Sequence, residues 1–499
     1  MKKMYALFIV LAASIGSVWA QTTVEVDGVN YNLDLVELTA EVGRNPDASG
    51  DITIPTTISY NGNSYDVTTI GWGAFSGCAG LTNINLPNSV TTIGSYAFNG
   101  CSLTDVTIPS SVTYLGTLAF GFNLTSIEVE DGNSVYKAID GVLFSIDGAT
   151  LYYAIRRSAY TIPANVITIG DHAFGGSDLT SIEIPANVTI IGIGAFAGCT
   201  KLNSVIFEKG SRLTTIGMDA FFGTGITKIT VPSSVTTIGS GAFAYCTRLE
   251  TIEIEEGNRS YQFIDGNLLQ TVDGTLIAFL KNGVDGSYKI LDGVKIIGNS
   301  AFYNDQNLIG IEIPASVITI EGLAFAYCQE LSSVTFAPGS QLTTIGGNAF
   351  FSSGLTEITL QSKVPPTLSG ASIFEYAPLA TIIVPEGSEE AYKSYVATTD
   401  EWGQTNDSWS NYAHLIKSNP TSTERINDIA VIAYPNPTTG IITVTGLTAG
   451  EAIKMYSLSG AQVGSYVAPA AEMTIDLSNL SSGMYFVSAG GQMVRIIKK

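Results

Sequence analysis

A short phrase, Ile-Gly-x-x-Ala-Phe, recurs along most of the chain and restricts the possible folds more than any other feature. The phenylalanines that end the phrase and its variants are Phe75, Phe98, Phe120, Phe174, Phe196, Phe221, Phe243, Phe302, Phe325, Phe350 and Phe374. Eight of the ten spacings between them are 22 to 25 residues. A period of this length is typical of a solenoid, in which each repeat buries its apolar face only by stacking on its neighbours.

Each repeat contains two stretches that favour short strands. The repeat at residues 179–199 reads LTSIEIPANVTIIGIGAFAGC, and its first part alternates apolar with polar residues as a half-buried strand does. Pro185 ends that strand, because proline cannot extend a hydrogen-bonded ladder. The glycine of the phrase permits a sharp corner, and the phenylalanine supplies most of the core. We therefore expect a β-rich solenoid with two short strands per repeat.

Two long spacings, of 54 and 59 residues, contain related insertions near residues 130–160 and 255–290. Each insertion carries paired Asp-Gly turns flanked by apolar residues, as at Asp140-Gly141 and Asp265-Gly266. Asp-Gly between apolar residues is a strong hairpin signal. Each insertion is therefore predicted to be a β-hairpin that projects from the solenoid.

Both ends of the repeat region, residues 67–417, need caps. Residues 21–66 contain two hairpin-like turns and are predicted to form the N-terminal cap. A C-terminal cap is expected near residues 385–417, with a short helix from Glu389 to Val396 that Ser388 precedes as a helix-capping residue.

The repeat resembles the leucine-rich-repeat signature, specifically that of the BspA-like bacterial subclass. The resemblance covers roughly residues 22–417. It implies a leucine-rich-repeat solenoid and adhesion to host proteins or to other cells.

The tail of the chain has a different character. Residues 418–428 have the composition of a linker, and residues 429–499 contain short alternating strands separated by Gly and Asn turns, which favours a small β-sandwich. The motif Tyr434-Pro-Asn-Pro-Thr-Thr-Gly440 and the segments after it resemble the type A C-terminal sorting domain of the type IX secretion system. This resemblance implies handling by that machinery, export across the outer membrane, removal of the domain and frequent attachment to surface lipopolysaccharide.

The first twenty residues are predicted to be a signal peptide. Lys2 and Lys3 precede an apolar run, and Val18-Trp19-Ala20 forms a cleavage site before Gln21. That run is too short to span a bilayer, and no transmembrane segment is expected. We expect the protein in the extracellular space or on the outer-membrane surface, reached through the periplasm.

Charge and composition exclude several functions. The net charge of −21 repels nucleic acids and anionic lipids. The chain has only two histidines, and no catalytic arrangement of nucleophile, base and acid can be assembled, so we expect neither an enzyme nor a cofactor.

The cysteines occupy one position of the repeat. Cys78, Cys101, Cys199, Cys246 and Cys328 each lie three residues after a repeat phenylalanine, where other repeats carry Asn, Ser, Thr or Asp. This pattern predicts a small, weakly polar position and free thiols. A metal site would need paired cysteines at short spacing, so none is expected. A disulfide between Cys78 and Cys101 is conceivable, although parallel side chains in register rarely meet its torsions.

Two groups of side chains are candidates for contacts with a partner. The acids at strand centres are predicted to face outward, either as contacts or through repeat drift: Glu128, Glu183, Glu253 and Glu312. The first insertion carries Tyr152, Tyr153, Arg156 and Arg157, which form either a contact patch or the packing of the hairpin on the solenoid.

These features together predict an exported solenoid that works by binding a host or bacterial surface protein. The first alternative is a glycan-binding protein for nutrient capture, which aromatic residues aligned on one exposed face would favour. The second is an enzyme, which a buried pair of carboxylates in a cleft would favour.

Overall fold

The computed structural model describes residues 22–280, 286–399, 405–418, 432–434, 438–457, 461–489 and 492–499. The predicted signal peptide and nearly all of the predicted linker lie outside these residues. The chain divides into two compact units: a solenoid unit, Met1–Ile382 with Ser394–Leu415, and a tail unit, Ile383–Lys393 with Ile416–Lys499.

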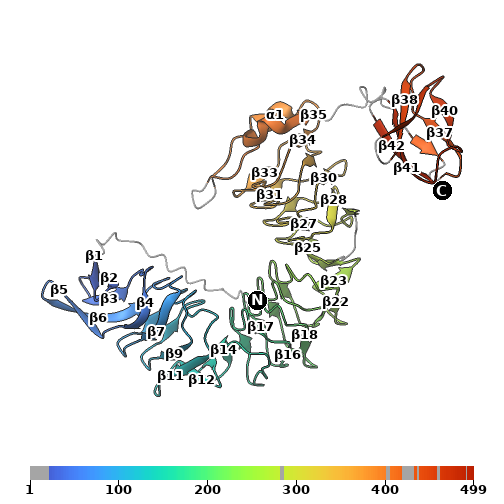
Figure 1. The fold of residues 1–499 in the computed structure, drawn as a ribbon. Helices are drawn as coiled ribbons and strands as arrows, with labels where there is room; N and C mark the ends of the chain where they lie inside the picture. The colour runs from blue at the N-terminus through green and yellow to red at the C-terminus, as the bar shows by residue number, and fades with distance from the viewer. Residues whose placement is uncertain are drawn as a thin grey trace, which may run out of the picture. The chain divides into compact units, whose positions relative to one another are not determined.

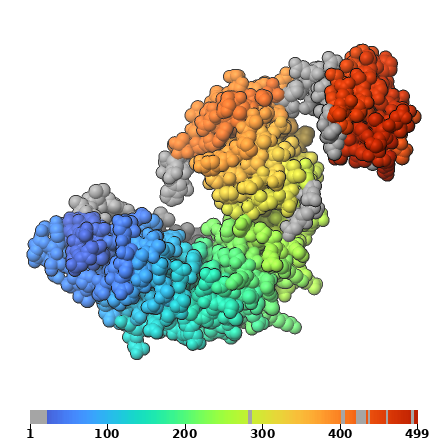
Figure 2. Space-filling view, in the orientation of Figure 1, coloured from blue at the N-terminus to red at the C-terminus, as the bar shows by residue number. Residues whose placement is uncertain are grey.

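Each turn of the solenoid contributes one longer and one shorter strand, as predicted (Figure 1). In β16 (Ser181–Ile184), exposed residues alternate with buried ones, and β16 pairs in parallel with β18 (Ser204–Phe207) of the next turn. The two-residue strands β15 (Thr168–Ile169) and β17 (Ile190–Ile191) also pair in parallel. The turns follow one another in chain order, from blue to orange in Figure 2.

The strands of the turns form two sets. The other longer strands are β4 (Ser49–Thr53), β7 (Gly80–Asn85), β9 (Asp105–Ile108), β11 (Ser126–Val129), β20 (Lys228–Val231), β22 (Thr251–Ile254), β26 (Gly286–Lys289), β28 (Leu308–Ile313), β30 (Ser333–Phe336), β32 (Glu357–Thr359) and β34 (Thr381–Val384). The other strands of the second set are β6 (Asn63–Ile70), which β5 (Thr57–Tyr60) joins, β8 (Thr92–Ile93), β10 (Tyr114–Leu115), β19 (Thr215–Ile216), β21 (Thr237–Ile238), β27 (Ile296–Ile297), β29 (Thr319–Ile320), β31 (Thr344–Gly346) and β33 (Thr367–Ser369).

The repeat phenylalanines form the core. All eleven are buried, and rings of adjacent turns stack face to face. Phe196 lies 5.2 Å from Phe174 and 5.4 Å from Phe221 between ring centroids, with both interplanar angles at 2°. The predicted solenoid core is therefore confirmed.

The glycine of the phrase stands where a Cβ would be hindered, as predicted, and the hindrance comes from the neighbouring turn. A Cβ on Gly217 would lie 2.6 Å from the backbone carbon of Gly192 in the preceding turn, which real Cβ atoms do not tolerate. The left-handed residue stands two positions later, as at Asp219 (φ 53°). The glycine is needed because backbones of adjacent turns approach closely, rather than for an unusual dihedral angle.

Each insertion forms a three-stranded antiparallel meander. In the first, β12 (Tyr136–Ile139) and β13 (Val142–Ser145) make the predicted hairpin, with Asp140 and Gly141 at φ 50° and 70° in its turn. The third strand, β14 (Thr150–Ala154), pairs antiparallel with β13 and parallel with β15. The hairpin therefore does not stand away from the solenoid, because β14 joins it to the sheet of order β12-β13-β14-β15-β17-β19-β21.

The same meander occurs three times among the described residues. The second insertion forms it with β23 (Tyr261–Ile264), β24 (Asn267–Gln270) and β25 (Thr275–Phe279). The N-terminal cap forms it with β1 (Thr22–Val26), β2 (Val29–Asp34) and β3 (Thr39–Val42), and β3 pairs in parallel with β6. The solenoid thus consists of a first array (63–129), a second array (168–254) and a third array (286–382), each led by a meander.

A meander divides the core as well as the sheet. Leu143 of β13 packs in the core that precedes it, whereas Val142 and Phe144 pack in the core that follows. Opposite faces of one strand therefore close one array and open the next.

Two side chains seal each junction. Asn133 donates from Nδ2 to the carbonyls of Pro109 and Val112 at 3.0 Å, and Leu115 N–H of β10 donates to Tyr136 Oη at 3.1 Å. At the second junction Asn258 and Tyr261 repeat these contacts, with Ile238 N–H of β21 donating to Tyr261 Oη at 2.8 Å. These side chains supply partners that a further turn would otherwise provide, so the sheet edge does not stay open.

The C-terminal end of the solenoid is closed by Trp409. Its indole Nε1 donates to the carbonyl of Pro366 at 2.7 Å, and its ring packs on Phe374. Trp409 begins a 3-10 helix (Trp409–Leu415). The predicted helix is α1 (Glu389–Lys393), which ends before Val396.

The tail unit contains two antiparallel sheets with a common core, in agreement with the predicted β-sandwich. One sheet has three strands in the order β36 (Ile432–Tyr434), β37 (Ile441–Thr445) and β40 (Glu472–Asp476), and the other has four in the order β39 (Gln462–Val467), β38 (Ala452–Ser457), β41 (Gly483–Ala489) and β42 (Gln492–Lys498). Ile442, Met455 and Val487 lie fully buried between them. The short strand β35 (Ile416–Ser418) lies outside these two sheets.

Candidate binding surface

The four strand-centre acids face solvent, as predicted, but the structure does not bring them together. Glu128, Glu183, Glu253 and Glu312 lie on β11, β16, β22 and β28, which belong to four different sheets. Among the described residues, no group of three or more His, Cys, Asp or Glu side chains could hold a metal ion. The participation of the four strand-centre acids in binding stays a prediction.

Two of these acids form surface ion pairs across adjacent strands. Glu253 lies 2.6 Å from Lys228 Nζ, and this contact lowers the pKa of the carboxyl group. Glu312 lies 3.6 Å from Lys289 Nζ. Exposed pairs of this kind contribute little to stability.

The aromatic and basic group of the first insertion has two different environments. Tyr153 donates from Oη to the carbonyl of Gly121 at 2.9 Å, and burial raises the pKa of Tyr153. The Arg157 guanidinium lies 5.0 Å from the ring centroid of Tyr160 and donates to the carbonyl of Asp140. These contacts hold the meander against the solenoid.

The other two members of the group reach the surface. Tyr152 is exposed and packs edge-on against Tyr136, with ring centroids 5.5 Å apart. Arg156 donates twice to Asp178, at 2.6 and 3.2 Å, and Lys201 approaches the same carboxylate at 2.8 Å. The two cations lower the pKa of Asp178. A role for Tyr152 or Arg156 in binding stays a prediction.

The cysteines are free and buried, as predicted. Cys199 Sγ donates to the carbonyl of Phe174, one turn earlier, at 3.0 Å, and Cys246 does the same to Phe221. Burial raises the pKa of the Cys199 thiol to about 12, which disfavours the reactive thiolate. The position is therefore a small polar contact between turns.

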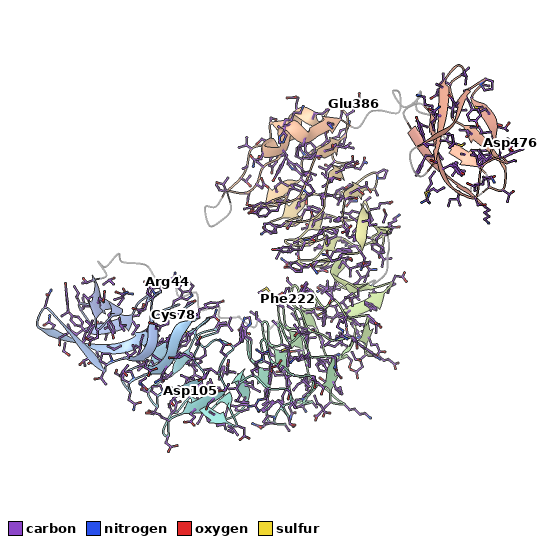
Figure 3. All side chains as sticks on the ribbon, in the orientation of Figure 1. Arg44, Cys78, Asp105, Phe222, Glu386 and Asp476 are labelled. Atoms are coloured by element: carbon purple, nitrogen blue, oxygen red, sulfur yellow. The ribbon has the colours of Figure 1, made fainter. Side chains whose placement is uncertain are left out.

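Sequence reasoning missed a row of aromatic side chains, which we call the aromatic strip. It takes one ring from each of six successive repeat-phenylalanine turns: Phe222, Tyr245, Tyr303, Tyr327, Phe351 and Tyr376. The five pairs that follow one another in sequence have ring centroids 5.8, 6.4, 5.4, 5.6 and 5.3 Å apart. Phe222 also lies 5.7 Å from Tyr303, so the first three rings form a cluster from which the last three continue along the turns. Figure 3 labels Phe222, the first ring of the strip.

Three tyrosines of the strip have an unfavourable backbone conformation. Tyr245, Tyr327 and Tyr376 have φ of 59°, 61° and 60°, in the left-handed region. Earlier turns have glycine at this position, for example Gly77 and Gly198. The conformation costs a residue with a side chain about 1–2 kcal/mol.

Two of these three tyrosine side chains are too exposed for their burial to offset this cost. Tyr245 is 48% exposed and Tyr376 is 72% exposed. Strained residues of this kind are concentrated at functional sites, where the surrounding structure holds them in place. The strip is therefore the strongest candidate for a binding surface.

A cavity lies at each array junction, where the regular stacking of turns is interrupted. The cavity at the second junction, of about 210 Å³, is lined by Tyr245 and Tyr303 of the strip and by Asn304, Asp305 and Gln306. The cavity at the first junction, of about 340 Å³, is lined by residues that include Tyr152, Tyr153 and His172. The second cavity is thus continuous with the aromatic strip.

Parallel two-strand turns, stacked phenylalanines and a terminal β-sandwich define a leucine-rich-repeat solenoid with a separate tail. Residues 55–145, 167–272 and 278–399 match the BspA type leucine rich repeat region, in six copies. The chain belongs to this family, as the sequence predicted. Residues 432–499 match the secretion system C-terminal sorting domain, which directs export to the cell surface or the medium. No curated protein matches the chain.

Several solved structures are similar. A leucine rich cell surface protein from Faecalibacterium prausnitzii is 25% identical over 74% of this chain and 97% of its own, with a TM-score of 0.40. The pneumococcal vaccine antigen PcpA is 21% identical over 73% and 87%, with a TM-score of 0.38. A leucine-rich repeat protein from Bacteroides ovatus is 24% identical over 73% and 94%, with a TM-score of 0.31.

Among the described residues, no helix has the length and apolar character needed to cross a bilayer.

Proposed function

We propose that this exported protein adheres to a host protein or to another cell, and that the aromatic strip is its contact surface. The strip is the single observation that supports the proposal most. Tyrosine and other aromatic side chains are enriched where proteins bind partners, because each contributes a large rigid contact area. An array of stacked turns presents such side chains in one extended row, which suits a macromolecular partner.

The enzymatic alternative has weaker support. It requires two buried carboxylates in a cleft, whereas Asp305 is the only acid among the described residues that line the cavity beside the strip. Burial raises the pKa of Asp305, but a single acid does not provide the acid and base pair of a hydrolase.

A binding assay with the full chain tests the proposal. Tyr245→Gly, Tyr327→Gly and Tyr376→Gly are combined in one variant, and binding to immobilised matrix proteins and to intact host and bacterial cells is compared with that of the unchanged protein. Phe122→Ala is the matched control, because Phe122 is an exposed ring outside the strip. Loss of adhesion in the triple variant alone is expected. Equal adhesion of all three proteins would contradict the proposal.

Nutrient capture through glycan binding is the second candidate. The alignment of six aromatic side chains on one face favours it. Adhesion and nutrient capture would use the same strip, and the cell-binding assay separates them, because only adhesion holds the protein on another cell.

A further inference from the structure

The cavity at the second array junction combines aromatic rings with one carboxylate. We propose that this cavity binds the cationic end of a lysine or arginine side chain of the partner protein, with Tyr245, Tyr303 and Asp305 as its contacts. This inference rests on the proposed function, because it names the partner chemistry that the first rings of the aromatic strip recognise.

Asp305 departs from the pattern of its repeat position. The third residue after the repeat phenylalanine is uncharged in the other turns: Cys78, Cys101, Asn123, Ser177, Cys199, Thr224, Cys246, Cys328, Ser353 and Ala377. Where this residue is Cys199 or Cys246, its thiol donates to the phenylalanine carbonyl of the turn before. The carboxylate of Asp305 has no proton to donate, so its charge does not serve this contact between turns.

The local backbone does not explain the charge either. Asp305 Oδ1 accepts from the N–H groups of Asn307 and Leu308 at 2.9 and 3.2 Å. An asparagine would accept the same two hydrogen bonds through its amide oxygen. Among the described residues no cation pairs with Asp305, and burial raises the pKa of its carboxyl group. The charged carboxylate is therefore poorly solvated, and a cation that enters the cavity would stabilise it.

Two tyrosine rings line the same cavity and meet at nearly a right angle. The ring centroids of Tyr245 and Tyr303 lie 6.4 Å apart, with an interplanar angle of 84°. Phe222 packs against both rings, at 5.8 and 5.7 Å, and so holds their orientation. A cation is attracted to the face of an aromatic ring within about 6 Å of its centroid, and more strongly where water is excluded. The two rings and the carboxylate thus attract the same kind of ligand.

The size and the polar groups of the cavity favour a single cationic side chain. The cavity volume of about 210 Å³ is smaller than the roughly 300–1,000 Å³ of most small-molecule sites. Gln306, which also lines the cavity, donates from its amide nitrogen to the carbonyl of Tyr327 at 2.8 Å, which leaves its amide oxygen as a further acceptor. Ammonium and guanidinium groups carry only donors, and the net charge of −21 attracts a basic partner.

Ligand-detected NMR titrations of the full chain test the inference. The probes are capped tripeptides with lysine, arginine or neutral norleucine between two glycines, and tetramethylammonium. We expect the lysine or the arginine peptide to bind at least about tenfold more tightly than the norleucine peptide. Tetramethylammonium should bind more weakly than the better of these two peptides, because it has no N–H group to donate to the carboxylate.

Asp305→Asn separates the charge from the fold. The variant keeps both hydrogen bonds of the turn, so its Tm should stay unchanged, whereas its affinity for the cationic peptide should fall about tenfold. Asp147→Asn is the matched control, because it removes one charge and Asp147 accepts a similar turn bond from Ala149 N–H at 2.9 Å outside the cavity. Its affinity should equal that of the unchanged protein. Tyr245→Gly should lower the affinity about fivefold through loss of one ring.

Several results would overturn the inference. They are the absence of binding by both cationic peptides, equal binding of the norleucine peptide or of tetramethylammonium, unchanged affinity in Asp305→Asn, or an equal loss in Asp147→Asn. If the triple strip variant loses cell adhesion but Asp305→Asn adheres fully, the proposed function stands and this inference fails. If cationic peptides bind through Asp305 but the triple strip variant adheres like the unchanged protein, the cation site stands and the adhesive function of the strip fails.

Discussion

The hydroxyl group of Tyr261 offers a direct test of how the arrays are sealed. The N–H of Ile238, in β21 at the edge of the sheet formed by the short strands of the second array, donates to this hydroxyl at 2.8 Å, and both residues are buried. Tyr261→Phe keeps the buried ring and removes only the oxygen. In this variant the buried Ile238 N–H loses its acceptor, and water does not easily reach the site to replace the hydroxyl.

The unpaired N–H of Ile238 sets the expected loss of stability. A buried N–H without a partner costs about 1–3 kcal/mol, which corresponds to a loss of about 5- to 150-fold in hydrogen-exchange protection where opening is local. Because coupling in a solenoid is between neighbours, amides of β19 and β21 should lose protection while those of the first array keep it.

Native-state hydrogen exchange read by mass spectrometry measures this effect. Tyr114→Phe is the matched control, because Tyr114 is 56% exposed, and its protection pattern should equal that of the unchanged protein. If Tyr261→Phe left β21 fully protected, or weakened all three arrays equally, the hydroxyl would not be the seal that the structure indicates.

Four further predictions follow from the same geometry. Phe196→Ala should destabilise the second array by about 3–5 kcal/mol, seen as joint loss of exchange protection in adjacent turns, and a melting curve like that of the unchanged protein would contradict the buried stack. The five cysteines should resist alkylation in the folded protein and take up five equivalents when it is denatured without reductant; a smaller uptake would reveal disulfides. Because burial raises the pKa of the Cys199 thiol to about 12, the unfolded chain loses this proton first, so stability measured by urea unfolding should fall as pH rises above about 8.5. Deleting residues 427–499 should leave the melting of the solenoid within about two degrees and retain the protein in the periplasm; its appearance at the surface would show that the tail is not the sorting signal.

The sequence was most informative where the repeat is strict. The spacing of the phenylalanines predicted the stacked core, and the shared position of the cysteines predicted a small polar contact, because both depend on one repeat meeting its equivalent in the next. Local signals were also reliable at short range, since the Asp140-Gly141 turn joins the predicted hairpin.

The rest depended on contacts that no local pattern reveals. The pairing of β14 with β15 joins segments outside the hairpin, so turn chemistry could not show that the meander enters the solenoid sheet. The aromatic strip escaped notice because its rings alternate between two positions, as at Tyr303 and Tyr327, and neither position is aromatic in every repeat. Aligning the repeats on their phenylalanines and pooling both positions would have found it.

The division of the solenoid core at a meander also affects how this chain would respond to force. A protein that holds a partner at a cell surface is pulled along its length, and a solenoid with one continuous core would have few internal stops once its end begins to unravel. Here each meander closes one core and opens the next, so unravelling should halt at Tyr261 or Tyr136 before a new core must be broken. Extension would then proceed in steps, each releasing one array, and the protein would lengthen under load while its remaining arrays stay folded.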